Sequence, residues 1–189
     1  MRSALTTLIL VAPEAQERAM DDVELRIQLE RAHADCFGWA MACCGRHRDD
    51  AEEVLQIVYL TVLDGRARYD GRSSFRTWLF GVIRRTAASE RRKAWLRGLL
   101  LKREADGLEP EALAAPDAEV ERDSRRYSLG YALAQLAPRQ HEVLQLVFYH
   151  EMTVDEAAAV MGVSVGSART HYARGKARLA TLLGDAREL

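Results

Sequence analysis

The sequence is poor in proline and has almost no net charge. Only four of its 189 residues are proline, and no Asn-Gly or Asp-Gly pair lies between two alternating apolar runs. These absences argue against a β-sheet protein built from hairpins. The apolar residues recur instead at the three-to-four spacing of helices, so we predict an all-α fold. Almost half of the residues are apolar and more than a quarter are charged, as in soluble globular proteins.

The apolar stretch near the N-terminus is short. It runs from Leu5 to Val11, too few residues to cross a bilayer and barely enough for the core of a signal peptide. We interpret residues 1–21 as an N-terminal extension, with Met20 as an alternative start. We therefore expect a cytoplasmic protein that does not insert into membranes.

Cysteine is scarce, and Cys36, Cys43 and Cys44 lie between His33 and His47. If this segment is one helix, rising about 1.5 Å per residue, the two histidines are about 20 Å apart and cannot share a metal ion that needs ligands near 2 Å. We therefore expect no metal and no cofactor, and interpret the cysteines as buried, reduced thiols. The alternative is a metal or redox role for the cysteines, including a metalloenzyme.

The net charge of −1 would argue against a nucleic-acid partner if the charges were evenly spread. They are concentrated in blocks of opposite sign. Residues 84–103 carry one acid and eight cations, whereas residues 104–123 carry one cation and eight acids. The basic block, whose cations are Arg84, Arg85, Arg91, Arg92, Lys93, Arg97, Lys102 and Arg103, is a candidate for phosphate contacts.

The C-terminal quarter has the signals of a helix-turn-helix. Thr153 and Glu156 have the spacing of a capping box, which predicts that a helix begins at Thr153. Gly162 can adopt the left-handed conformation that ends a helix. After a short turn, Ser164 can cap a second helix.

The second helix of this motif is amphipathic. Its apolar stripe is formed by Val165, Ala168, Tyr172, Gly175 and Leu179, and the cations Arg169, Arg174, Lys176 and Arg178 lie largely off that stripe. A short turn followed by a helix with a cationic face matches the geometry that enters a DNA major groove. We favour DNA binding over the alternative, an ordinary helical hairpin with a solvated basic face.

The chain divides into three further segments. Residues 22–95 have a helical pattern, interrupted by loop signals near Asp64-Gly65 and Tyr69-Ser74. Residues 96–123 are acidic and lack a sustained periodicity, so we predict a flexible linker. Helical periodicity resumes in residues 124–189, where Pro138 suits the first position of a helix. We therefore expect two small helical domains joined by a flexible acidic linker.

Four motifs in this order resemble those of bacterial extracytoplasmic-function (group IV) RNA polymerase sigma factors. They are residues 50–60 (DAEEVLQIVYL), 69–79 (YDGRSSFRTWL), 136–144 (LAPRQHEVL) and the helix-turn-helix of residues 153–179. The resemblance covers most of residues 22–183. It implies that residues 22–95 form sigma region 2, which binds the polymerase clamp and the promoter's −10 element, and that residues 124–189 form region 4, which binds the −35 element.

The resemblance also implies roles for particular residues of region 2. The clamp-binding helix would present Asp50, Glu53, Gln56 and Tyr59. The −10 element would meet aromatic side chains that can hold an unpaired base and arginines that can hold phosphates. These candidates are Tyr69, Phe75, Trp78, Arg84, Arg85, Arg91 and Arg92. The alternatives are a solvated helix face for the clamp set and a place in the hydrophobic core for Phe75 and Trp78.

In region 4 the resemblance implies that Arg169, Thr170, Ala173 and Arg174 read the −35 element, with His171 and Lys176 better placed for phosphates. Arginine suits this role because its planar fork matches the O6 and N7 atoms of guanine. The implied partners are core RNA polymerase, promoter DNA and an anti-sigma factor. No small-molecule substrate and no enzymatic activity are expected, and the acidic linker would pass through the polymerase's RNA exit path.

The sequence departs from the family pattern at several positions. Arg85 replaces an asparagine that helps to form the −10 base pocket, and Ile57, Ser89 and Tyr172 are also unusual. Gly175 lies inside a helix at a cost of up to about 1 kcal/mol relative to alanine, which we attribute to close packing against the first helix of the motif. The rival function is a dimeric helix-turn-helix regulator that binds an operator without joining the polymerase holoenzyme.

Overall fold

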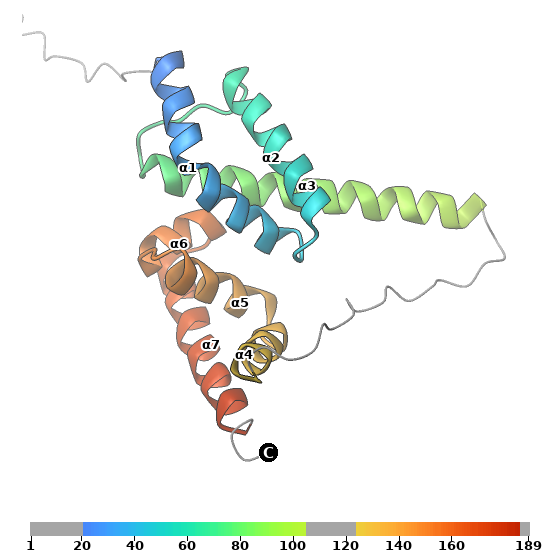
Figure 1. The fold of residues 1–189 in the computed structure, drawn as a ribbon, viewed down its shortest axis with the longest axis vertical. Helices are drawn as coiled ribbons and strands as arrows, with labels where there is room; N and C mark the ends of the chain where they lie inside the picture. The colour runs from blue at the N-terminus through green and yellow to red at the C-terminus, as the bar shows by residue number, and fades with distance from the viewer. Residues whose placement is uncertain (1–20, 105–123, 186–189) are drawn as a thin grey trace, which may run out of the picture.

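The computed structural model describes residues 21–104 and 124–185, and within these ranges the regular structure is entirely helical. The first half contains α1 (Asp22–Cys43), α2 (Arg48–Leu63) and α3 (Phe75–Glu104). The second half contains α4 (Ser124–Ala134), α5 (Pro138–Leu144), the π-helical segment η1 (Gln145–Tyr149), α6 (Val154–Met161) and α7 (Val165–Asp185). The all-α prediction is confirmed (Figure 1).

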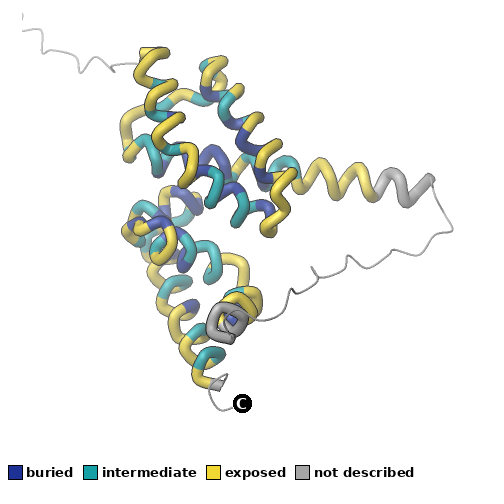
Figure 2. Tube along the Cα trace, viewed as in Figure 1, coloured by how far each residue is buried: buried dark blue, intermediate teal, exposed yellow. Residues whose placement is uncertain are grey.

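The three N-terminal helices pack on one another through the stripes that the periodicity predicts. The side chains of Val54, Leu55, Val58 and Val62 are buried on α2, and those of Leu79, Val82 and Ile83 are buried on α3. Leu29, Cys36 and Trp39 complete this core from α1. Figure 2 shows the buried positions of these helices facing one another.

Two boundaries differ from the predictions. The segment from His33 to His47 is not one helix: α1 ends at Cys43, and Gly45 and Arg46 have φ angles of 63° and 68°, which turn the chain before α2. The linker begins later than residue 96, because α3 continues to Glu104 and extends beyond the other helices (Figure 1). Residues 96–104 are mostly leucine, lysine and arginine, which are good helix formers with or without a packed stripe. The acidic part of the predicted linker, residues 105–123, lies outside the described ranges, as do residues 1–20.

The helix-turn-helix forms as its local signals predict. The Thr153 hydroxyl accepts a hydrogen bond from the Glu156 backbone N–H, and the Glu156 carboxylate accepts one from the Thr153 N–H at 2.9 Å. Gly162 ends α6 in the left-handed conformation, with φ 64°. The Ser164 Oγ accepts from the Ser167 N–H at 3.2 Å and caps α7. Pro138 stands in the first turn of α5, as predicted.

The two halves share one hydrophobic core, and α6 packs directly against α3. Val143, Leu146, Val160 and Met161 belong to the same buried cluster as the residues of α1, α2 and α3. Figure 1 shows α6 lying beside α3, with α7 leading away from it. This contact was not predicted, because the sequence pattern indicated two separate domains. None of the helices in the described ranges is both long and apolar enough to cross a membrane.

Candidate DNA and polymerase interfaces

The predicted −35 side chains share the outer face of α7. Arg169, Thr170, Ala173, Arg174 and Lys176 are exposed, and His171 is partly buried. The opposite face is turned inward, since Ala168 and Gly175 are buried and Val165, Tyr172 and Leu179 are partly buried. The predicted amphipathic stripe is confirmed, and the structure brings the six predicted residues together on one helix.

Local contacts hold parts of this face in place. The Arg169 guanidinium lies 3.3 Å from an Asp155 carboxylate oxygen, and both side chains are more than half exposed. The Lys176 ammonium lies 4.9 Å from the ring centre of Tyr172. Arg174 makes no ion pair with any described residue. It therefore presents a complete guanidinium fork to solvent, which suits a base edge or a phosphate.

Gly175 packs against α5, so the prediction that it packs against the first helix of the motif is wrong. A Cβ atom at this position would lie 3.1 Å from Leu144 Cδ1 and 3.2 Å from Gln140 Cβ. The glycine therefore permits the close approach of α7 to α5. The sequence places Leu144 on the apolar stripe of α5. That position does not indicate that Gly175 of α7 packs against it.

The three predicted −10 aromatics form a cluster at the start of α3. The ring centres of Tyr69, Phe75 and Trp78 lie 5.4–5.6 Å apart. Each side chain is partly buried, and Phe75 and Trp78 pack against the main core. The Tyr69 hydroxyl donates to the Ser73 carbonyl, which fixes the loop that precedes α3. The cluster therefore serves the core and also keeps aromatic surface accessible.

The predicted arginines of α3 divide into two groups. Arg85, Arg91 and Arg92 are exposed. Arg84 instead points toward the C-terminal half, where it forms an ion pair with Glu142 of α5, and its side chain is only 23% exposed. In this arrangement Arg84 is not available to a phosphate.

The predicted clamp residues on α2 differ in how far they are exposed. Asp50, Glu53 and Gln56 are exposed on one face of the helix. Tyr59 is partly buried, and its hydroxyl lies 3.0 Å from His33 Nδ1 on α1. Burial raises the pKa of the Tyr59 hydroxyl, and the neighbouring Cys36 raises it further. Tyr59 therefore supports the packing of α2 on α1, and the three polar residues form the accessible face.

The cysteines are free thiols, and Cys36 and Cys44 are buried while Cys43 is partly buried. Burial raises the pKa of the Cys36 and Cys43 thiols to about 12, so both are protonated and weakly nucleophilic at neutral pH. This agrees with the interpretation of buried, reduced cysteines. Among the described residues, no group of three or more His, Cys, Asp or Glu side chains could hold a metal ion.

Sequence reasoning missed the residues that join the two halves. Trp39 of α1, Phe80 of α3 and His150, which follows η1, pack ring against ring, and Glu142 pairs with Arg84. His150 is a buried histidine that follows two exposed aromatic residues, and this arrangement has no helical periodicity from which its burial could be predicted. No local pattern in the sequence could have indicated this contact.

Two family models match separate parts of the chain. Residues 29–97 match the family model for sigma-70 region 2, and residues 126–179 match that for sigma-70 region 4. The chain is 34% identical over 135 residues to the RNA polymerase sigma factor CarQ of Myxococcus xanthus, covering 71% of this chain and 75% of CarQ. It is 27% identical over 183 residues to the ECF RNA polymerase sigma factor SigC of Mycobacterium tuberculosis, covering 97% and 91% of the two chains.

Solved structures share the fold. The sigma factor RpoE of Bartonella quintana, solved in complex with the anti-sigma factor NepR, has a TM-score of 0.64 at 23% identity, covering 85% of this chain and 97% of RpoE. CnrH, solved in complex with the cytosolic domain of CnrY, has a TM-score of 0.58 at 21% identity, covering 87% and 90%. Both similarities extend over the two helical halves.

Proposed function

Since this chain belongs to the extracytoplasmic-function RNA polymerase sigma factors of the sigma-70 family, we propose that its two halves divide promoter recognition as regions 2 and 4. The chain is an alternative sigma factor that binds core RNA polymerase and directs transcription initiation at particular promoters. The assignment of each task to particular side chains is our proposal. The observation that carries it is the combination, in one chain, of an exposed cationic recognition helix and an aromatic cluster beside exposed arginines.

The −35 element is read by the outer face of α7. Arg169, Thr170, Ala173 and Arg174 contact base edges, and His171 and Lys176 contact phosphates. Support comes from the exposure of this face and from the caps that fix α7 relative to α6. Arg174 is the strongest candidate for a guanine because no described carboxylate competes for its guanidinium.

The −10 element is held by the first turns of α3 and the loop before it. Tyr69, Phe75 and Trp78 offer aromatic faces to an unstacked base, which is how proteins commonly hold single-stranded nucleic acid. Arg85, Arg91 and Arg92 hold the phosphates on either side. Arg84 joins them only when its ion pair with Glu142 is broken. Melting is assisted because a captured base no longer pairs.

Core RNA polymerase binds the polar face of α2 formed by Asp50, Glu53 and Gln56. Acidic and amide groups on one helix face suit a basic partner, because complementary charge steers association and fixes register. Tyr59 supports this helix through its contact with His33, and its partly exposed side chain lines a surface hollow together with Gln56. The protein performs no covalent chemistry of its own, and it works in the cytoplasm, where its polymerase and promoters are. An anti-sigma partner is also proposed, since RpoE was solved with the anti-sigma factor NepR and CnrH with the cytosolic domain of CnrY.

Reconstituted transcription tests the proposal. Core polymerase, the purified chain and a promoter mapped after overexpression should give a run-off transcript that disappears when the chain is omitted. Templates altered only at −35 or only at −10 should each lose most of the signal. A chain that binds the template but leaves initiation by core polymerase unchanged would instead be the operator-binding regulator, the function that the match to region 2 disfavours.

A further inference from the structure

A hollow of about 330 Å³ lies between α1, α3 and α5, beside the ion pair of Arg84 with Glu142. This volume is at the lower end of the range for small-molecule sites. Arg84, Ala88 and Arg91 recur along one face of α3 and form one wall. Arg139 and Glu142 form the facing wall on α5. The hollow is therefore lined mainly by charged side chains and by one small side chain.

The charges around this hollow do not balance. Three guanidiniums, those of Arg84, Arg91 and Arg139, share the lining with the single carboxylate of Glu142. That carboxylate serves two of them, because Arg84 pairs with one oxygen and Arg139 Nη1 lies 3.0 Å from the other. Arg91 forms no ion pair with any described residue. The lining therefore carries an excess of two positive charges.

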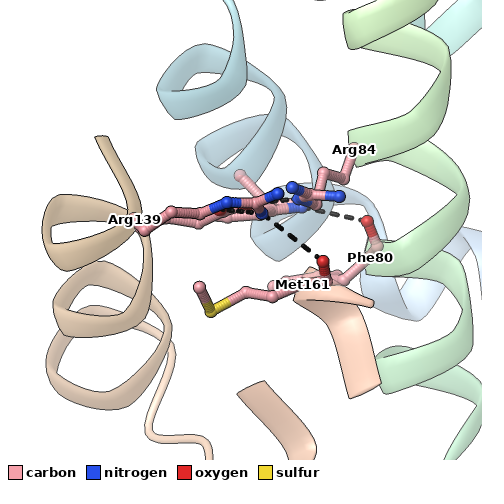
Figure 3. Close-up of polar contacts among 6 residues, drawn as sticks. Phe80, Arg84, Arg139 and Met161 are labelled. Carbon is pink, nitrogen blue, oxygen red and sulfur yellow. Dashed lines mark hydrogen bonds and ion pairs between the residues drawn. The ribbon is translucent and has the colours of Figure 1, made fainter. Parts of the chain in front are cut away.

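The two paired arginines keep hydrogen-bond donors for a further anion. Arg84 uses its Nε–H for Glu142, and no hydrogen bond joins its two terminal nitrogens to any described residue. Within the described part of the chain, Arg139 binds Glu142 and the Met161 carbonyl through Nη1 alone. Figure 3 shows the Arg84 and Arg139 side chains reaching toward each other from opposite helices. Because a guanidinium has five N–H donors in a rigid fork, the remaining edges can hold the oxygens of an anion.

The titratable neighbours in the lining add no charge at neutral pH. Burial lowers the pKa of the His141 imidazole, and the Arg46 guanidinium lowers it further. Burial raises the pKa of the Cys43 thiol to about 12. His141 is therefore a neutral ring that can donate or accept a hydrogen bond, and Cys43 is a neutral thiol.

A phosphate monoester matches this lining in charge and in shape. It carries a charge of about −1.5 to −2 at pH 7, close to the excess positive charge of the hollow. Its oxygens suit guanidinium forks that approach from two sides. The volume suits one small molecule, whereas a nucleic-acid strand needs a groove that continues for several nucleotides.

We propose that this hollow binds a small phosphorylated molecule. Arg84 and Arg139 hold the phosphate from opposite walls, and the exposed Arg91 attracts it from solvent. Ala88 of α3 and Ala42 of α1, both in the lining, leave room for the rest of the molecule. The site does not depend on the proposed function, because it follows from the cavity and its charges alone.

Isothermal titration calorimetry of the full chain tests the site. Inorganic phosphate and AMP should both bind, whereas adenosine, which has no phosphate, should not. Arg139→Gln removes one of the two holding guanidiniums and should weaken AMP binding by about tenfold or more. Arg97→Gln removes an exposed cation of α3 outside the lining and should change it by less than about twofold. Equal losses in the two variants would indicate general charge attraction and overturn the site.

Ala88→Leu provides a second test that alters no charge. Its side chain fills part of the hollow, so AMP binding should fall by about tenfold or more while the helix content measured by circular dichroism stays unchanged. Ala94→Leu, at an exposed position of α3, is the matched control and should bind as the wild type does. Wild-type protein that binds neither phosphate probe, or binds citrate more tightly than AMP, overturns the proposal. A short single-stranded DNA whose binding is lost in Ala88→Leu would assign the hollow to nucleic acid instead.

Discussion

His150 is a titratable side chain enclosed by aromatic rings, so its charge state affects the contact in which it lies. Burial lowers the pKa of its imidazole from the ordinary value near 6.5 to about 4. The Arg76 guanidinium on α3 lowers this pKa further, and the Asp35 carboxylate on α1 opposes the shift. The contact therefore favours the neutral ring over the protonated one. The stabilisation that His150 gives to this contact is therefore fully present above about pH 6.5 and is lost as the pH falls toward 4.

We expect the contact between the two halves to weaken between pH 7 and pH 5, with a rise in the radius of gyration of the wild-type chain. His150→Phe keeps a ring of similar size but cannot be protonated, so its radius should stay nearly constant over this range. His47→Gln, a change at an exposed histidine before α2, should leave the wild-type pH dependence intact. An equal response to pH in His150→Phe and wild type would show that another group controls the contact.

Arg174 is the side chain on which the −35 assignment depends most. Arg174→Ala should weaken binding to the cognate −35 duplex by about 1–3 kcal/mol, because a bidentate contact to guanine is lost. Affinity for core polymerase should not change, since α7 lies on the other half of the molecule from the α2 face. Arg178→Ala removes an exposed cation from the same helix and serves as the matched control. Fluorescence anisotropy measures both, and equal losses in the two variants would indicate general charge attraction only.

At the scale of the helices, Gly175 permits a close approach of α7 to α5. Gly175→Val should lower the free energy of unfolding by about 1–3 kcal/mol, because the new atoms would overlap the buried Leu144 and the Gln140 side chain. Gly166→Val places the same side chain near the exposed start of α7, where the nearest atom is 4.0 Å from the added Cβ. Urea denaturation should give the Gly166→Val control a free energy of unfolding close to that of the wild type. A stable Gly175→Val chain would mean that α7 can move away from α5 without cost.

The helix-turn-helix could be predicted almost completely, because each of its signals is local. Thr153 and Glu156 cap α6, Gly162 ends it and Ser164 caps α7, all through contacts within a few residues. Apolar periodicity likewise indicated the buried stripes of α2 and α3. The same rules failed at the end of α3, because residues 96–104 form a helix without the sustained apolar stripe on which the prediction relied.

The candidate site was predictable to the extent that it lies on single helices. The outer face of α7 and the acidic face of α2 follow from periodicity once a helix is assigned. Arg84 was correctly placed on α3, but its partner Glu142 is 58 residues away in the sequence. Trp39 and His150 are farther apart still. Such pairings depend on how finished helices pack, which no local pattern specifies.

At the scale of the whole molecule, the two halves are joined by a shared hydrophobic core as well as by the chain that connects them. The buried cluster continues from Trp39 and Phe80 into Val143, Leu146 and Val160 without interruption. A core shared in this way couples the unfolding of its parts, since neither half can open without exposing apolar surface of the other. The same continuity means that any partner that separates the halves must compensate for the apolar surface that becomes exposed.

This coupling predicts how the wild-type chain unfolds. Scanning calorimetry should record one cooperative transition for the helices of both halves, because their core is continuous. In Gly38→Leu, where Tyr149 and His150 are displaced, the transition should split, with the C-terminal half melting first because it keeps the smaller set of buried side chains. Gly98→Leu, a change in open space on the projecting part of α3, should retain the single transition. Two independent transitions in the wild-type chain would mean that the halves fold separately, and the shared core would then contribute little to the stability of either.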